Sequence, residues 1–393
     1  MREAVIVEGA RTAVGRAKKG TTRHVRADDM MAEVIAELLR RVEGAISPAE
    51  IGDVNIGCAM PEGSQGLNIA RQVAIRSGLP VSIPAQTINR FCSSGLQAIA
   101  AAAYQIMAGD IDIAIAGGME TMSLVPMTGF RISPNPYLAR NEPEVYMSMG
   151  LTAEHVAEEY GVSREAQDEF AYHSHMKAVR AWDEGRFDGQ IVPFEFEEVW
   201  YEDGERRSKT VVFERDEHMR RDTTLEALAK LKPSFKPDGT VTPGNSSPLS
   251  DGAAAVILVA REQAEARGLK PRLRFRNFAA AGVRPEVMGI GPIEAVPKVL
   301  KLAGLSLNDL DVIELNEAFA AQSVAVIRTL ELDPDRLNVN GGAIALGHPL
   351  GCTGAKLTVQ LMYEMERREA SLGMVTMCIG GGMGAAGVFE RIS

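Results

Sequence analysis

The chain of 393 residues has few cysteines and little positive charge, and both absences exclude classes of function. Its four cysteines, Cys58, Cys92, Cys352 and Cys378, form no Cys-x-x-Cys pair and lack the spacing of a zinc site. We therefore expect neither a disulfide framework nor a metal. Lysine and arginine number 42 against 52 acidic residues, a net charge of −10 that argues against nucleic acid as a main partner.

Long hydrophobic runs are also absent. No apolar stretch approaches the ~18 residues of a membrane span. Residues 1–10 enter a short strand-like run rather than the apolar segment of a secretory signal. With 46% apolar and 24% charged residues, the chain has the composition of a globular protein of two or three domains. We expect a cytoplasmic protein without a membrane span.

What the chain does contain is an alternation of strands and helices that occurs twice, typical of an α/β protein. The helix expected at 28–42, for example, has apolar residues at positions 30, 31, 34, 35, 38 and 39, the spacing of one buried face. In the first half we predict strands at 4–8, 53–58, 83–88 and 111–116, and helices at 28–42, 67–77 and directly after Cys92. In the second half we predict strands from 273, at 312–315, near 337 and at 374–379, and helices at 292–302, 318–330 and 353–365.

Matching landmarks in the two halves predict a duplicated unit with an insertion. The Cys-Ser-Ser-Gly of 92–95 resembles the Cys-Thr-Gly of 352–354, and Ala-Gly-Gly-Met at 116–119 resembles Gly-Gly-Gly-Met at 380–383. A last strand at 384–390 follows these glycines at once, whereas its look-alike at 252–258 comes about 130 residues later. We therefore predict a first half from 1–119 plus 250–270, an inserted lobe at 120–249 and a second half at 271–393.

Cys92 lies where a predicted strand turns into a buried helix, in the segment Asn-Arg-Phe-Cys-Ser-Ser-Gly. The unpaired N–H groups and partial positive charge of a helix N-terminus favour the thiolate, and small neighbours admit a substrate. This context indicates a nucleophile. A small core side chain is the alternative for any single cysteine.

Three later segments also put a reactive group into a bend between apolar segments: Asn-Glu-Ala-Phe at 316–319, Gly-His-Pro at 347–349 and Cys-Ile-Gly-Gly-Gly-Met-Gly at 378–384. Together with Cys-Ser-Ser-Gly at 92–95, in this order and with these separations, they resemble the thiolase family of acyl-CoA C-acyltransferases. The resemblance extends over the whole chain. It implies a duplicated αβαβα layered fold with an inserted loop domain.

The resemblance assigns roles to these residues in cleaving or forming a 3-ketoacyl thioester. Cys92 would attack the keto carbon, and His348 would accept its proton. Cys378 would protonate the leaving enolate or remove the α-proton in the reverse Claisen condensation. Asn316 and His348 would form one oxyanion hole, and the backbone N–H groups of Cys92 and Gly380 the other. A core histidine and a packed thiol are the alternatives for His348 and Cys378.

Two further acidic and thiol groups have less direct expectations. Glu317 would orient the Asn316 loop, with helix capping as the alternative, and Cys352 would serve in packing.

Coenzyme A would be a substrate rather than a bound cofactor. By resemblance, Arg220 would face its nucleotide end, Ser247 would bond the pantetheine amide, and Phe235, Met149 and Met288 would line its tunnel. For the methionines and the phenylalanine, a purely structural place in the core is the alternative.

One departure from the family pattern concerns the acyl pocket. In acetoacetyl-CoA-specific thiolases a histidine usually precedes the Met-Gly pair, but Ser148 precedes Met149 here, and the segment 123–145 is shorter. We expect a degradative 3-ketoacyl-CoA thiolase acting in fatty acid β-oxidation, with an acetoacetyl-CoA-specific biosynthetic enzyme as the alternative.

Two more distant functions are weighed against the same residues. The second thiol and the Asn-Glu-Ala-Phe segment oppose a ketoacyl synthase, which pairs its nucleophilic cysteine with two histidines or with histidine and asparagine. The complete set of reactive residues opposes a non-catalytic acyl-CoA carrier. The family also implies a homodimer or homotetramer and a possible β-oxidation partner enzyme.

Overall fold

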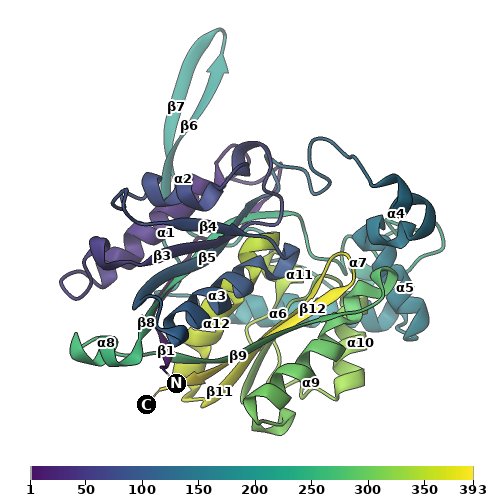
Figure 1. Cartoon of the computed structure of the whole chain (residues 1–393). Helices are drawn as coiled ribbons and strands as arrows, with labels where there is room; N and C mark the ends of the chain where they lie inside the picture. The colour runs from purple at the N-terminus through teal and green to yellow at the C-terminus, as the bar shows by residue number, and fades with distance from the viewer. Residues whose placement is uncertain (1, 393) are drawn as a thin grey trace.

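One large mixed sheet forms the frame of the molecule. The structure is a computed structural model that describes residues 2–392. The sheet has the strand order β10-β11-β12-β9-β1-β8-β5-β3-β4, with the short β2 beside β8 (Figure 1). Its strands are β1 (Ala4–Arg11), β2 (Gly15–Arg16), β3 (Asp53–Gly57), β4 (Ala85–Ile88), β5 (Ile113–Thr121), β8 (Ser250–Ala260), β9 (Leu273–Gly282), β10 (Val312–Leu315), β11 (Leu372–Ile379) and β12 (Met383–Arg391).

The two halves of the chain supply the two ends of this sheet. They meet where β1 pairs with β9 in antiparallel register, Val5 opposite Arg274 and Ile6 opposite Leu273. The helices of the first half are α1 (Ala27–Arg41), α2 (Ile69–Arg76) and α3 (Ser94–Ala108), and α8 (Arg261–Ala266) follows β8. Those of the second half are α9 (Gly291–Ala303), α10 (Ala320–Leu330), α11 (Ala343–Leu346) and α12 (Leu350–Arg368).

The expected strand near 337 is wrong: it shrinks to a single bridge between Leu337 and Ile313. Asn338 has a left-handed backbone, with φ of 43°, which turns the chain away after one residue. Its side-chain amide then donates to the carbonyl of Leu315 and accepts from the N–H of the same residue, at 2.9 and 2.8 Å. A side chain thus replaces further pairing along β10.

Side chains alternate across each strand and build separate cores on the two faces of the sheet. In β8, Ala254, Val256 and Leu258 face the helices α3 and α12, while Ala255 and Ile257 face α1 and α2. In the second half, Val375 and Met377 of β11 join the same α3 and α12 core, and the opposite face packs on α9 and α10. Helices α3 and α12 therefore form a central layer between the two halves of the sheet, giving the order αβαβα.

The two central helices touch through glycine. A Cβ at Gly95 of α3 would lie 2.8 Å from the backbone of α12, at Ala355 N and Gly351 O. A Cβ at Gly354 of α12 would lie 2.3 Å from Leu96 N of α3. Only glycine allows two helix backbones to approach this closely. These two residues therefore set the distance between the N-terminal ends of α3 and α12.

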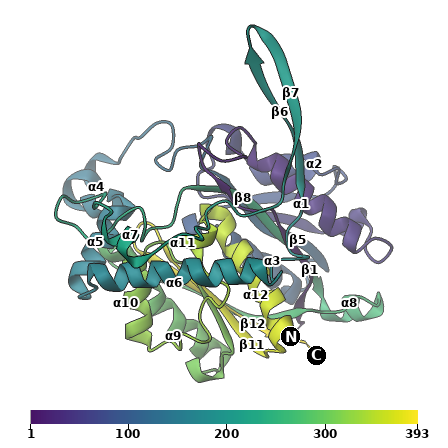
Figure 2. The same ribbon diagram turned by 180° about the vertical axis from the view of Figure 1, so that it is seen from behind.

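Residues 122–249 contribute no strand to the large sheet in the described part of the chain. They contain α4 (Pro136–Asn141), α5 (Met149–Glu159), α6 (Arg164–Asp183), α7 (Leu225–Ala229) and the hairpin of β6 (Phe194–Glu202) with β7 (Glu205–Phe213). The hairpin projects from the body of the molecule, and α6 lies across the face seen in Figure 2. Strands β5 and β8, which flank this long segment in the sequence, are antiparallel neighbours.

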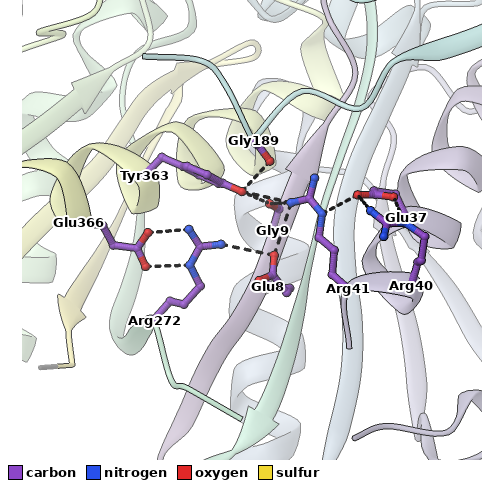
Figure 3. Close-up of polar contacts among 9 residues, drawn as sticks. All are labelled: Glu8, Gly9, Glu37, Arg40, Arg41, Gly189, Arg272, Tyr363 and Glu366. Carbon is purple, nitrogen blue, oxygen red and sulfur yellow. Dashed lines mark hydrogen bonds and ion pairs between the residues drawn. The ribbon is translucent and has the colours of Figure 1, made fainter. Parts of the chain in front are cut away.

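A polar network ties the segments together at the seam of the two halves (Figure 3). Arg272, just before β9, binds Glu366 of α12 through two hydrogen bonds of 2.7 and 2.6 Å. Its guanidinium also lies 4.4 Å from the ring centre of Tyr363. The Tyr363 hydroxyl donates to Gly189 in residues 122–249, at 2.7 Å, and accepts from Arg41 of α1 at 3.1 Å. The network therefore joins both halves to the intervening segment.

Candidate active site

Cys92 occupies a sharp turn between β4 and α3. The residues Phe91–Ser93 form a short 3-10 turn, and Phe91 has φ of 43°, a conformation that a bulky residue seldom adopts. Strain of this kind is typical of a functional turn that exposes a nucleophile. The thiol faces its own backbone N–H and that of Gly380, which comes from the opposite half of the chain.

The N–H groups at this turn favour the Cys92 thiolate as expected, but burial outweighs them. Burial raises the pKa of the thiol to about 12, and the nearby Glu120 carboxylate acts in the same direction. The N–H groups of Gly380 and Cys92 lower this pKa but do not offset the loss of water. The thiol is therefore protonated at neutral pH, and a base has to remove its proton during the reaction.

Cys378 lies at the end of β11, fully buried. Burial raises the pKa of its thiol, and the neighbouring Cys92 raises it further by repelling a second negative charge. Gly381 and Gly382 follow with φ of 79° and 88°, so the chain reverses directly after the thiol and enters β12. The fold thus brings the ends of β4 and β11 together and places the two thiols near each other.

His348 is held by hydrogen bonds at several atoms. Its backbone N–H donates to Ser250 Oγ at 3.1 Å, and its Nδ1 lies 2.6 Å from Thr353 Oγ1. Its Nε2 lies 3.4 Å from Asn316 Nδ2. Burial, and second the positive charge of Lys356, lower the pKa of His348 to about 3. The ring is therefore neutral at pH 7 and available as a base.

Asn316 directly follows β10 and is completely buried. Its Oδ1 has no hydrogen-bond partner among residues 2–392. A buried amide oxygen without a partner costs roughly 1–3 kcal/mol, which a bound water molecule or substrate group would offset. Its position beside His348 leaves this oxygen free to bind a water molecule or a substrate group.

Two buried carboxylates fix the loops that carry these groups. Glu317 accepts hydrogen bonds from Ser174 Oγ, Asn338 Nδ2 and the Ile344 N–H, which ties the Asn316 loop to α6 and α11. Glu120, at the end of β5, accepts from the N–H groups of Ala59 and Gly351, at 2.8 and 2.9 Å. It therefore links the loop after β3 to the start of α12, directly behind Cys92.

Sequence reasoning missed Glu120, Ser250, His218 and Thr353. Ser250 Oγ lies 3.0 Å from His218 Nε2, and burial lowers the pKa of that histidine to about 4. The signal for Glu120 was a single charge inside an otherwise apolar strand. The signal for Thr353 was its spacing of five residues from His348, at the start of a helix. Ser250 and His218 offered no local signal, since their partners are distant in sequence.

The residues expected to bind CoA fall into two groups. Met149 and Met288 pack with Phe319 against Cys378, and the Phe235 ring meets the Phe319 ring edge-on with centres 6.2 Å apart. Met288 is buried in this cluster, whereas Phe235 is exposed. The role of these side chains in binding CoA stays a prediction.

Arg220 is exposed and borders a separate cavity of about 410 Å³, together with His218, Ser246 and Pro248. Ser247, between two of these lining residues, donates its N–H to Ala318 O at 2.9 Å. The floor of this cavity reaches His218 and, through Ser250, the backbone of His348.

Cys352 lies apart from the reactive groups, in the core between α3, α12 and the sheet. Among residues 2–392, no group of three or more His, Cys, Asp or Glu side chains could hold a metal ion. No helix in this described part of the chain is long and apolar enough to cross a membrane.

Comparison with known proteins agrees with the fold. Family models described as "Thiolase, N-terminal domain" and "Thiolase, C-terminal domain" match residues 4–262 and 269–391. A 3-ketoacyl-CoA thiolase of Bacillus subtilis is 58% identical over 391 residues, 99% of this chain and 100% of the relative. The peroxisomal 3-ketoacyl-CoA thiolase 1 of Arabidopsis thaliana is 46% identical, covering 99% of this chain and 88% of that one.

A crystal structure of Bacillus anthracis acetyl-CoA acetyltransferase superposes with a TM-score of 0.91 at 40% identity, over 100% of this chain and 99% of the other. This match confirms the expected duplicated α/β layered fold. The family expected from the four motifs is confirmed as well. With the reactive cysteines, histidine and asparagine gathered at the junction of its two halves, this chain belongs to the thiolase family.

Proposed function

We propose that the protein is an acyl-CoA C-acyltransferase that cleaves 3-ketoacyl-CoA with free CoA into acetyl-CoA and a shortened acyl-CoA. The observation that carries this proposal is the meeting of two buried thiols with a neutral histidine and an unpartnered asparagine oxygen. Relatives at 45–58% identity that bear the name 3-ketoacyl-CoA thiolase support it. No resident cofactor is needed, since CoA is a substrate.

The first half of the reaction forms an acyl-enzyme. His348 Nε2 takes the proton of Cys92, and the thiolate attacks the keto carbon. The keto oxygen accepts hydrogen bonds from the N–H groups of Cys92 and Gly380. The C–C bond then breaks, and the enolate oxygen of acetyl-CoA meets the protonated His348 and a water held by Asn316. Cys378 gives its proton to the enolate carbon, which releases acetyl-CoA.

The second half transfers the acyl group to CoA. The Cys378 thiolate takes the proton of the CoA thiol, and the resulting CoA thiolate attacks the acyl group on Cys92. As Cys92 leaves, His348 returns its proton, so every group ends in its starting state. In the reverse direction the same site performs a Claisen condensation.

A degradative role with acyl chains longer than C4 is the finer proposal. Ser148, which directly precedes α5, stands where acetoacetyl-CoA-specific thiolases usually have a histidine. The next residue, Met149, lies against Gly380 and Cys378. At position 148 the chain has no histidine that would shorten the pocket for the acyl chain. An acetoacetyl-CoA-specific enzyme is the second candidate, favoured by the likeness to a structure named as an acetyl-CoA acetyltransferase.

Assembly, location and pathway belong to the same proposal. We propose a homodimer or homotetramer, a place in fatty acid β-oxidation beside a possible partner enzyme of that pathway, and a cytoplasmic location. Seven bacterial relatives and one peroxisomal plant relative carry the name 3-ketoacyl-CoA thiolase.

The test is intact-protein mass spectrometry after brief exposure to 3-ketoacyl-CoA esters from C4 to C16 without free CoA. We expect an adduct of each shortened acyl mass on the wild type and none on Cys92→Ser. Adduct only from the C4 ester would favour the acetoacetyl-CoA-specific enzyme. Binding of the esters without any adduct or CoA release would overturn the proposal in favour of a non-catalytic carrier.

A further inference from the structure

The ring of His348 has one short contact and one long one. Nδ1 lies 2.6 Å from the hydroxyl of Thr353, whereas Nε2 lies 3.4 Å from the amide nitrogen of Asn316. An amide nitrogen is a donor only, so Nε2 facing it carries a lone pair rather than a proton. A neutral imidazole has one N–H, which then sits on Nδ1 and donates to Thr353.

The Thr353 hydroxyl binds the histidine ring instead of a backbone carbonyl of its own helix. Threonine hydroxyls inside helices commonly donate to the carbonyl four residues earlier. Thr358, five residues further along α12, does so, with its hydroxyl 2.8 Å from Gly354 O. The Thr353 hydroxyl has His348 Nδ1 as its one hydrogen-bond partner in residues 2–392. Both threonines are fully buried, so no bulk water replaces either contact.

The identity of the partner matters for the chemistry. A carboxylate on Nδ1–H would stabilise the protonated ring strongly, as in the Ser-His-Asp arrangement. A hydroxyl is a neutral acceptor: it fixes the tautomer and the ring orientation but adds no charge. The charge near this ring is instead positive, from Lys356 one turn further along α12. This positive charge adds to burial in lowering the pKa of the ring.

We propose that Thr353 is the positioning residue that keeps His348 in the Nδ1–H tautomer, which leaves the Nε2 lone pair available to take a proton. The inference rests on the proposed function for its kinetic consequence. In acylation the Cys92 proton moves to Nε2, while Nδ1–H remains hydrogen-bonded to the Thr353 hydroxyl. The proton on Nε2 returns to Cys92 when Cys92 leaves the acyl group. Thr353 itself neither gains nor loses a proton.

The kinetic test compares three variants with the wild type in thiolysis of a 3-ketoacyl-CoA. Thr353→Val keeps the shape but removes the acceptor, and we expect kcat to fall on the order of 10- to 100-fold with KM unchanged, since general base catalysis contributes about 10²–10⁴. Thr353→Ser restores a hydroxyl and should remain within about 3-fold of the wild type. Thr358→Val, the matched control on the same helix, should leave kcat within about 2-fold.

The structural readout is independent of activity. In protein labelled with ¹⁵N-histidine, the two nitrogens of a neutral ring have distinct shifts that report which one is protonated. His348 is identified among the six histidines by its absence in His348→Asn. We expect Nδ1–H in the wild type, Thr353→Ser and Thr358→Val, and loss of this single tautomer in Thr353→Val.

The outcomes separate the two proposals. A wild-type His348 carrying its proton on Nε2 would overturn the role of Thr353, even if Thr353→Val did not fold. An unchanged kcat in folded Thr353→Val would overturn it as well. A wild type with the Nδ1–H tautomer but no acyl adduct would overturn the proposed function and leave the positioning of the ring intact.

Discussion

Helices α3 and α12 occupy corresponding places in the two halves of the chain, but only α3 carries the nucleophile at its start. The crossing glycines Gly95 and Gly354 set the correspondence, and they place Cys352 opposite Ser93 rather than opposite Cys92. Cys352 accordingly lies in the core between the helices. A shared local pattern of Cys and Gly thus gives a reactive turn in one half and a packed side chain in the other, because one residue of register separates them.

The glycines within β5 and those that follow β11 have different backbone conformations. In the first half the chain passes straight through Gly117 and Gly118 within β5, where a Cβ on Gly117 would lie 2.3 Å from Ala254 O. In the second half Gly381 and Gly382 adopt positive φ and turn the chain into β12. The turn ends β11 at Ile379, one residue after Cys378, whereas the first half has the long segment 122–249 in place of a turn. The two halves therefore share the same arrangement of strands and helices, and the reactive groups lie where the two halves differ.

The largest effect should come from the thiol that only the second half has. We expect Cys378→Ala to lower the rate of 3-ketoacyl-CoA cleavage by about 10³, because proton transfer to the enolate carbon is lost. Acylation of Cys92 by a simple acyl-CoA should fall less, since the leaving CoA thiolate, unlike the enolate carbon, can leave without first taking a proton from Cys378. Cys352→Ala, the control, should keep both reactions, as measured by CoA release and intact mass. Rapid cleavage by Cys378→Ala would remove the proton-donor role.

The loops after β3 and β10 offer the next contrast. Cys58 and Asn316 each follow their strand directly, and both are buried. We expect Asn316→Ala to lower kcat on the order of 100-fold, as for loss of one oxyanion-hole donor or its bound water. Cys58→Ala should change kcat less than about 3-fold. Steady-state kinetics measure both, and equal losses in the two variants would show that the loops act only through stability.

The glycine crossing can be broken from either side. Gly354→Ala and Gly95→Ala should lower the free energy of unfolding by about 1–3 kcal/mol, because the new Cβ meets backbone atoms that cannot turn aside. Gly354→Ala should cost more, since its contact at 2.3 Å is the shorter. Denaturant titration measures the change. Gly282→Ala, whose Cβ would have no neighbour closer than 4.0 Å, should stay within about 0.5 kcal/mol.

The buried histidine of the second half makes the stability of the protein depend on pH. Burial lowers the pKa of His348 to about 3, below its ordinary value near 6.5, while His24 in the first half is exposed. Between these two pH values the unfolded chain binds a proton at position 348 that the folded chain does not. Stability therefore falls as pH drops from about 6.5 toward 3, by up to ~1.4 kcal/mol per pH unit for this group.

His348→Asn should flatten this acid dependence of the unfolding free energy by as much as one proton, and His24→Asn, at an exposed position, is the control for the substitution itself. Unfolding titrations at pH 4, 5, 6 and 7 provide the measurement. Identical slopes in the wild type and His348→Asn would contradict a ring that is neutral because it is buried.

Much of the fold is predictable from local patterns. Of the six apolar positions predicted to form the buried face of α1, positions 30, 31, 34, 35 and 38 are buried, and Leu39 is half-buried. The strand near 337 is the counterexample: Leu337 lies in an apolar core, but the left-handed Asn338 next to it ends the pairing. Hydrophobic spacing reports which face is buried, whereas the length of a strand depends on backbone geometry and on partners that are distant in sequence.

The sequence by itself determined the α/β alternation, the duplication and the reactive residue types, because each is encoded within a few neighbouring positions. Tertiary structure alone decided that residues 92, 316, 348 and 378 meet, that Thr353 faces the histidine ring, and that the two half-sheets join through β1 and β9. It also decided the protonation states. A helix start favours a thiolate, but burial of Cys92 among segments from both halves removes water and raises the pKa of the thiol, and no local pattern reveals how much water the folded chain excludes.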